Sequence, residues 1–176
     1  MKFEFDSLDF SNNNLSEDEE LELFISGGIS GARITDPFSK EADEHAERYY
    51  KEIRKFSTDV QKIVNNLNGM YSYEEILKIK EYLFINEQVL SDGVRQFDPD
   101  CSIAQSWQRL AFDFENVQKH DYTLLQHELA EMRFINNGKS QSEAHDLANM
   151  LYNYTVESNK YYESLRKEKC NNDKDI

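Results

Sequence analysis

The sequence predicts an all-α fold, a single compact multi-helix domain with a short N-terminal arm that is either extended or otherwise ordered. Only 6 glycines and 2 prolines occur in 176 residues, which is too little turn punctuation for many short strands. From residue 36 onward, apolar residues recur at helical spacing, and start and stop signals divide the chain into about six helices. Hydrophobic residues make up 39% of the chain, enough for the core of one domain.

The N-terminal region is predicted to be an appendage to this domain. Residues 1–15 alternate apolar and polar side chains, a pattern that fits either a short strand or an ordered arm. Ser16 and Glu19 have capping-box spacing before a short apolar run, and “SGGISGA” at 26–32 is the best candidate hinge. We therefore expect an arm with a short helix at 1–35, a helical domain at 36–168 and a frayed tail at 169–176.

Three helices are predicted before residue 86. The Asp-Pro pair at 36–37 is typical of an N-cap and first helical position, and it precedes the helical text “SKEADEHAERYYKEIRKF”. The segment “STDVQKIVNNLNG” follows and ends at an Asn-Gly stop signal. Ser72 and Glu75 then form a capping-box pattern that opens “YEEILKIKEYLFI”.

Residues 86–100 are predicted to be irregular, and three more helices follow them. Asp98-Pro99 starts the segment “DCSIAQSWQRLAF”. Asp121 or Thr123 can cap the next helix, which ends at the Asn-Gly pair 137–138. Ser140 and Glu143 form another capping box, which starts one long helix reaching Leu165.

The charge and the cysteines limit the possible environments and partners. A net charge of −14 repels phosphate backbones, so a generic nucleic-acid binder is not expected. The acidic surface either confers solubility or fits the basic surface of another protein. Cys101 and Cys170 form neither a disulfide framework nor a metal finger. With no apolar run long enough for a signal peptide or a membrane span, we expect a protein of the bacterial host cytoplasm.

The stretch “HDYTLLQHELAEM” at 120–132 carries the strongest candidate for a functional site. Its centre, His127-Glu128-x-x-Glu131, differs at one position from the H-E-x-x-H signature of zinc peptidases. Glutamate can also bind zinc, so His127, Glu131 and His145 could hold a divalent metal ion. Glu128 would then serve as the general base.

The helical arrangement of this stretch sets Glu128 apart from its neighbours. At about 100° per residue, Glu128 falls between two apolar arcs, whereas His127 and Glu131 lie together on a solvent-side shoulder. A carboxylate on an apolar face has to be paired, protonated or solvated by a pocket. Candidate partners from other helices are His145, Arg109 and Tyr152.

Two other interpretations of these residues remain open. A histidine and a glutamate can act as a metal-free acid–base pair, with His120 and His145 converging on His127. Alternatively, the same side chains are only polar residues of a packed helix and of helix ends, since His-Glu-x-x-Glu arises easily in an acidic helical chain. The candidate catalytic residues are His127, Glu128, Glu131, His145 and His120.

Much of residues 39–154 resembles a helical domain at the C-terminus of phage minor-head proteins and polymorphic-toxin-like proteins of Gram-positive bacteria. The resemblance is carried in order by “SKEADEHAERYYKEIRK”, “TDVQKI”, “ILKIKEYLF”, “DGVRQFDPDCSIAQSWQRL”, “HDYTLLQHELAEM” and “GKSQSEAHDLANMLYNY”. It implies a helical domain of phage or prophage origin, with hydrolase or nuclease activity. The positions that carry over are Asp92, Phe97, Asp100, Trp107, His127, Glu128, Glu131 and His145.

One departure from that family bears on the activity of this chain. The family tends to place a histidine just before its Leu-x-Asp-Gly segment, where this chain has Glu87 and Gln88. If that histidine is catalytic in relatives, this chain has lost it. Two function classes therefore follow: an effector hydrolase centred on the His/Glu residues, and an acidic inhibitor from a mobile element that blocks a bacterial defence or toxin protein.

Overall fold

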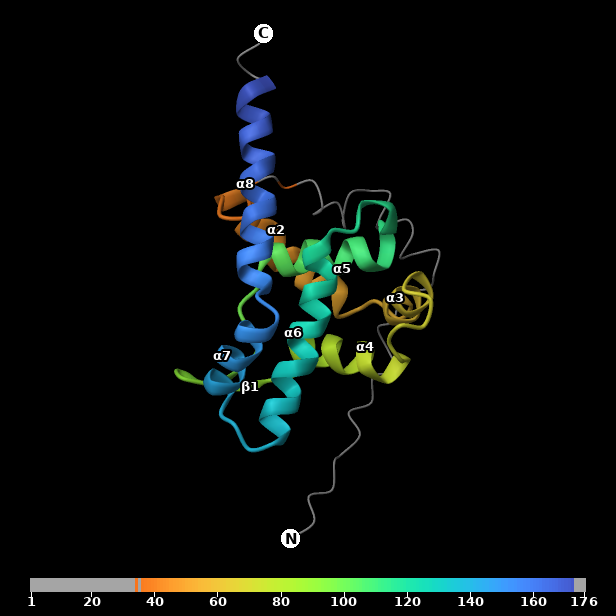
Figure 1. Ribbon diagram of the computed structural model, residues 1–176, viewed down its shortest axis with the longest axis vertical. Helices are drawn as coiled ribbons and strands as arrows, with labels where there is room; N and C mark the ends of the chain where they lie inside the picture. Colours follow the sequence, from red (N-terminus) through yellow and green to blue (C-terminus); the bar gives the residue numbers. More distant parts are fainter. Residues whose placement is uncertain (1–33, 35, 173–176) are drawn as a thin grey trace.

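The chain folds into helices joined by short loops, with one small hairpin (Figure 1). The computed structural model describes residue 34 and residues 36–172, so the arm predicted at 1–35 lies almost wholly outside the described residues. The predicted all-α class is confirmed. The described elements are α2 (Lys40–Ile53), α3 (Asp59–Asn66), α4 (Tyr73–Lys80), the π-helical turn η2 (Glu81–Ile85), β1 (Gln88–Leu90), β2 (Gly93–Arg95), α5 (Cys101–Phe112), the 3-10 turn η3 (Phe114–Asn116), α6 (Lys119–Asn136), α7 (Gln141–Leu151) and α8 (Tyr154–Asn172).

Two central helices organise the packing. Helix α5 packs against α2, α3 and α6, and α6 packs in turn against α4, α7 and α8. In Figure 1, α8 runs along one side of the body and extends beyond the other helices at its C-terminal end. Within the described part of the chain, no helix combines the length and apolar character needed to cross a membrane. The contact between α6 and α7 is the one that builds the candidate site.

The core between α2, η2 and α5 is aromatic. Phe84 packs edge-on against Trp107, with ring centroids 5.3 Å apart, and against Tyr50 at 4.8 Å. All three side chains are at most 1% exposed. Edge-to-face aromatic pairs stabilise a core beyond the area that they bury, so this cluster fixes η2 against α5.

A buried ion pair joins α3, α4 and α5. The ammonium of Lys80 lies 2.7 Å from Oδ1 of Asp59 and donates a second hydrogen bond, also 2.7 Å long, to the carbonyl of Phe56. The indole of Trp107 donates to the other oxygen of Asp59 at 2.9 Å. Lys80 is 4% exposed and Asp59 is fully buried. Each buried charge is therefore balanced by the opposite charge and by one further hydrogen bond, as a stable buried ion pair requires.

The capping boxes at Ser72/Glu75 and Ser140/Glu143 are confirmed, but three predicted helix starts are displaced. Helix α2 is capped by Ser39, whose hydroxyl accepts from the amide of Ala42, and not by Asp36. Helix α5 is capped by Asp100 and not by Asp98. In α6 the N-cap is Gln118, and its backbone amide donates to the carboxylate of Asp121, three residues further along the chain. In each case, the cap lies where a side chain can reach an unpaired helical amide.

The single long helix predicted from residue 140 is broken into α7 and α8. Asn153 causes the break, because its side-chain oxygen accepts the amide of Val156 at 3.0 Å, which would otherwise bond to the carbonyl of Tyr152. This break gives seven described α-helices in place of about six. Helix α8 continues to Asn172, past the predicted domain end at residue 168.

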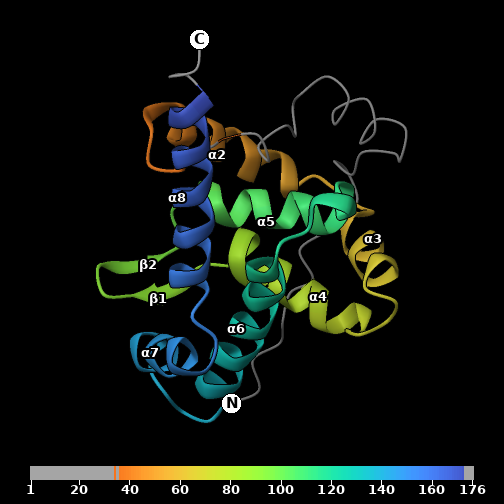
Figure 2. The ribbon, with the colours of Figure 1, turned by 45° about the horizontal axis from the view of Figure 1, so that its top comes forward.

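The segment predicted to be irregular contains an antiparallel hairpin. Val89 pairs with Val94 and Leu90 with Gly93, and Gly93 has a φ of +137°, which favours glycine. Figure 2 shows the hairpin projecting from the body beside α7. Ser91 and Asp92 form the loop between the strands, and the Ser-Asp-Gly run between two apolar residues is a turn signal that the sequence analysis overlooked.

Replacing Lys80 by methionine should lower the free energy of unfolding by about 3–5 kcal/mol, because it leaves the Asp59 carboxylate buried without its cation. Urea unfolding followed by circular dichroism measures the loss. Lys78→Met, an exposed change on the same helix, is the matched control and should alter stability by no more than about 0.5 kcal/mol. A loss below about 1 kcal/mol for Lys80→Met would contradict the role given to the ion pair.

Candidate metal centre

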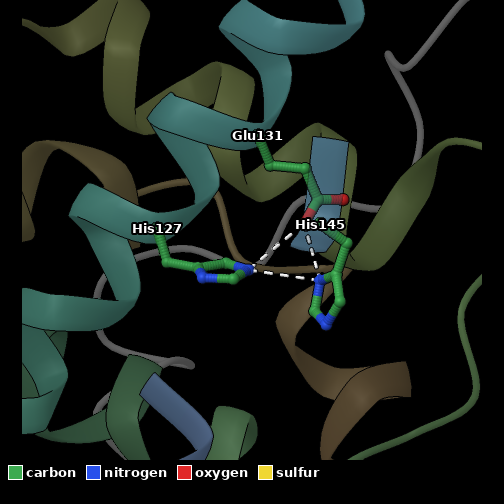
Figure 3. Close-up of side chains that lie close together, drawn as sticks. All are labelled: His127, Glu131 and His145. Atoms are coloured by element: carbon green, nitrogen blue, oxygen red, sulfur yellow. Dashed lines mark hydrogen bonds and ion pairs between the residues drawn. The ribbon is translucent and has the colours of Figure 1, made fainter. Parts of the chain in front are cut away.

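Helices α6 and α7 bring three metal-binding side chains together. His127 and Glu131 lie four residues apart on α6, so they are neighbours on its surface, and α7 places His145 against them (Figure 3). Nε2 of His127 lies 3.2 Å from Oε2 of Glu131 and 3.3 Å from Nδ1 of His145. Nδ1 of His145 lies 2.8 Å from the same Glu131 oxygen. We call these three residues the His–Glu cluster.

The spacing of these atoms suits a shared cation. Zinc bonds of about 2.0–2.1 Å in a tetrahedron place neighbouring donor atoms about 3.3 Å apart. The three donor atoms already form a triangle close to that size. Within the described ranges, this is the one group of three or more His, Cys, Asp or Glu residues with ligand atoms so close together. The cluster can therefore hold a metal ion with little rearrangement.

The tautomer of His127 is fixed by the break between α7 and α8. Nδ1 of His127 lies 2.9 Å from the carbonyl oxygen of Tyr152, which can only accept a hydrogen bond, so Nδ1 carries the proton. Nε2 is then the nitrogen that faces Glu131 and His145, and in the metal-binding form of the ring it would direct its lone pair at the ion. Metal-binding histidines characteristically donate their other ring N–H to a carbonyl or carboxylate in this way.

Glu131 is held by groups from two other elements. The hydroxyl of Tyr82, in the π-helical turn η2, and the side-chain amide of Gln141, at the start of α7, both donate to its Oε1. Burial opposes ionisation of Glu131, but hydrogen-bonding contacts with His127, His145 and Tyr82 outweigh it and lower its pKa to about 2. The contact with Glu131 also raises the pKa of His145. The carboxylate is therefore ionised, with Oε2 directed at the two rings.

Glu128 lies beside the cluster and is bonded to no other described residue. Glu128 is 5% exposed. Among the described residues, none forms a hydrogen bond or an ion pair with its side chain. Burial, together with the nearby charge of Glu131, raises the pKa of Glu128 well above its ordinary value. In the metal-free protein, both effects therefore favour the neutral form of Glu128.

Glu128 lines a pocket of about 260 Å³, which we call the site pocket. Glu131 and His145 line the same pocket, so both carboxyl groups adjoin one space. The other lining residues are Tyr50, Leu83, Phe97, Asp98, Asp100, Ile103 and Gln141. A partly apolar hollow with a few convergent polar groups is the usual form of a small binding site.

Two expectations from the helical arrangement of α6 are wrong. His127 and Glu131 are not on a solvent-side shoulder: they are 3% and 2% exposed, because α7 covers that face of α6. The burial of Glu128 is confirmed, but its suggested partners are engaged elsewhere. His145 contacts Glu131, and Tyr152 accepts from His127 through its carbonyl.

Arg109 and His120 belong to a separate buried network. Arg109 forms a bidentate pair with Asp121, with distances of 2.7 and 2.6 Å, and its Nη2 donates to Nε2 of His120 at 2.9 Å. The His120 ring also lies 4.9 Å from the ring of Tyr161. Burial lowers the pKa of His120 to about 4. The structure therefore brings His127, Glu131 and His145 together and does not place His120 with them.

The other positions marked by the resemblance are divided between the pocket, the core and the surface. Phe97 and Asp100 line the site pocket. Trp107 is fully buried in the core, and Asp92 pairs with Arg95 on the exposed hairpin. Both cysteines are free.

Sequence reasoning missed three residues that shape the cluster. Tyr82 and Gln141 hold Glu131, and neither has a local sequence signal because both act through tertiary contacts. Asn153 separates α7 from α8. An asparagine is a favoured N-cap residue, so its presence in “LYNYT” was a usable signal for the break.

No protein-family model matches the chain, and no curated protein or solved structure is significantly similar to it. A function therefore has to be inferred from the chemistry of these residues.

Zinc should bind at one ion per chain and raise the melting temperature. At 100 times the dissociation constant, binding stabilises the folded state by about 2.7 kcal/mol, or roughly 5–10 °C for a chain of this size. Affinity should be weaker at pH 5.5 than at pH 7.5, because both histidines have to be deprotonated to bind. Calorimetric titration and thermal unfolding measure these effects.

Alanine at His127 or His145 should abolish this binding. His145 is the safer test of folding, since its side chain is 45% exposed. His45→Asn, which removes a histidine from α2, is the control and should bind zinc like the wild type. Zinc binding that survives both alanine variants would contradict the assigned ligand set.

His120 should make the fold sensitive to mild acid. Its folded-state pKa of about 4 lies below the ordinary value of 6.5, so protonation favours the unfolded chain. The contribution of neutral His120 to the free energy of unfolding is fully present above pH 6.5. That free energy should fall by up to about 1.4 kcal/mol per pH unit as the pH drops toward 4. His120→Gln, which keeps an acceptor for Arg109, should reduce this slope in urea unfolding between pH 7 and 5. An unchanged slope would contradict the effect.

Proposed function

We propose that this chain is a metal-dependent hydrolase. His127, Glu131 and His145 hold a divalent ion such as zinc, and Glu128 is the general acid–base. One observation supports this most strongly: three donor atoms converge within 3.3 Å of one another, beside a buried glutamate that lines a pocket and is bonded to no other described residue.

The number and type of ligands favour catalysis over a structural role for the ion. Structural zinc sites are closed by four protein ligands, whereas catalytic sites use three and leave one position open. Two histidines and one glutamate are a known catalytic set, and the described residues supply three close donors and no fourth. The open position would adjoin the site pocket, since Glu131 and His145 both line it.

Each side chain has a distinct task in this mechanism. A bound ion would supply Lewis acidity, polarising the substrate and lowering the pKa of a water molecule. A cation bound beside Glu128 would favour its ionised form, which can accept a proton from the attacking water and return it to the leaving group. Tyr82 and Gln141 fix the Glu131 carboxylate by donating to its Oε1. Tyr152, through its carbonyl, keeps the Nε2 lone pair of His127 directed at the centre.

The biological setting that fits this activity is a mobile element. The resemblance to phage minor-head and toxin-like proteins favours an effector acting inside a bacterial cell. Such an effector would harm the cell that expresses it, and substitution of the cluster would relieve that harm. The family's histidine before “LSDG” is missing in this chain. That does not affect this mechanism, because none of the residues used in the mechanism comes from that segment.

A second candidate function is an acidic inhibitor that binds and blocks a bacterial defence or toxin protein. The observation that favours it is the net charge of −14, from 34 acidic and 20 basic residues. Electrostatic complementarity of this kind weakens as salt screens the charges. An inhibitor would keep its partner binding when His127 and Glu128 are replaced, and it would not harm an expressing cell.

Glu128→Gln should separate chemistry from folding. With zinc bound at one ion per chain, the variant should hydrolyse p-nitrophenyl acetate or fluorescent casein at least about 100-fold more slowly than the wild type, since it cannot transfer a proton. Its melting temperature should equal or exceed that of the wild type, because no hydrogen bond is lost. Glu115→Gln makes the same change at an exposed residue and should leave the rate unchanged.

Two results would contradict this role of Glu128. One is a full hydrolytic rate in Glu128→Gln, which would move the acid–base elsewhere. The other is a wild-type protein that binds zinc but hydrolyses neither probe above the rate of free zinc, which would favour the inhibitor.

A further inference from the structure

A second pocket lies beside the hairpin and shares the lining residue Gln141 with the site pocket. It has a volume of about 520 Å³ and lies between the hairpin and the first residues of α7; we call it the hairpin pocket. Gln141 lines both pockets and also donates to Glu131. The two hollows are therefore neighbours on either side of a residue that touches the His–Glu cluster, so a ligand longer than a small molecule could contact both.

The charges along this path exclude a phosphate polymer. Asp98, Asp100, Glu128 and Glu131 all line the site pocket, and no lysine or arginine does. Arg95 is the only lysine or arginine among the residues lining the hairpin pocket. It is already paired with Asp92 and Asp98, at 2.9 Å each. A nucleic acid would meet acidic groups with no available cation, whereas a basic ligand would be attracted.

The walls of the site pocket suit a side chain that is apolar along its length and basic at its end. Tyr50, Leu83 and Ile103 supply apolar walls, and Asp98 and Asp100 supply carboxylates. Lysine and arginine pack their aliphatic stems on apolar surface while the charged head meets polar groups. Glu128, the proposed acid–base, lines the same pocket.

The hairpin supplies a surface for extended backbone. Its two strands are three residues long, and within the described part of the chain they pair only with each other, so no described strand covers the amides and carbonyls of their outer edges. Val89 and Val94, which face each other in the register, are 75% and 64% exposed. Extended peptides bind such edges by adding a strand, with apolar side chains as secondary contacts.

We infer that the substrate is an extended polypeptide that inserts a lysine or arginine side chain into the site pocket and continues past Gln141 along the hairpin. This inference rests on the proposed hydrolase function. In the reaction, the oxygen of water bonds to the peptide carbonyl carbon, the C–N bond breaks, and a proton passes through Glu128 to the released amine. No oxidant or reductant is required.

A binding experiment tests the substrate class independently of turnover. The full chain, without added metal, is titrated into fluorescent eight-residue peptides that differ only in a central lysine, arginine, norleucine or glutamate, and into a fluorescent single-stranded oligonucleotide. Lysine and arginine peptides should bind at least about 10-fold more tightly than the norleucine peptide. Asp98→Asn combined with Asp100→Asn should remove that preference, since asparagine keeps the α5 cap. The exposed Glu74→Gln is the control.

Three outcomes overturn the inference: equal binding of the lysine and norleucine peptides, tighter binding of the oligonucleotide, or no peptide binding at about 1 mM, which is already a weak affinity. Zinc titration and Glu128→Gln decide the hydrolase separately. If the hydrolase stands and the peptides do not bind, only the substrate class falls. If lysine peptides bind but the zinc-loaded protein hydrolyses neither probe, the two pockets form a peptide-binding site, and the claim that the peptide is a substrate is overturned.

Discussion

The buried carboxylate of Glu131 is the interaction on which the rest of the site depends. A charged carboxylate in the interior is tolerated only when its oxygens are paired. Here the partners come from three elements: His127 on its own helix, Tyr82 in η2, and Gln141 and His145 on α7. Satisfying one charge therefore fixes how α7 lies on α6, and it also directs two histidine nitrogens at the same oxygen.

Glu128 distinguishes a functional centre from a polar seam between helices. A seam that only joins α6 to α7 would account for Glu131, whose oxygens are all engaged. It does not account for a second carboxyl group that is 5% exposed, has no partner among the described residues and pays for burial by staying protonated. Residues that weaken the fold without a local compensation are concentrated at functional sites. The position of Glu128 beside the site pocket is consistent with that rule.

The sequence predicts the helices of this chain better than the way in which they meet. Capping boxes at Ser72 and Ser140 are local signals and are found where expected, as is the burial of Glu128 on α6. The covering of His127 by α7 and the contact of Tyr82 with Glu131 depend on tertiary packing, which helical spacing does not encode. His145 was a candidate because of its residue type, and only the crossing of α7 over α6 brings it to Glu131.

Diffraction from crystals of the zinc-loaded chain, collected on both sides of the zinc absorption edge, tests the central claim most directly. The account predicts one strong anomalous peak about 2.0–2.2 Å from Nε2 of His127, Oε2 of Glu131 and Nδ1 of His145, with a remaining coordination position open toward Glu128. A cluster without a peak, or an ion held by other residues, would contradict it.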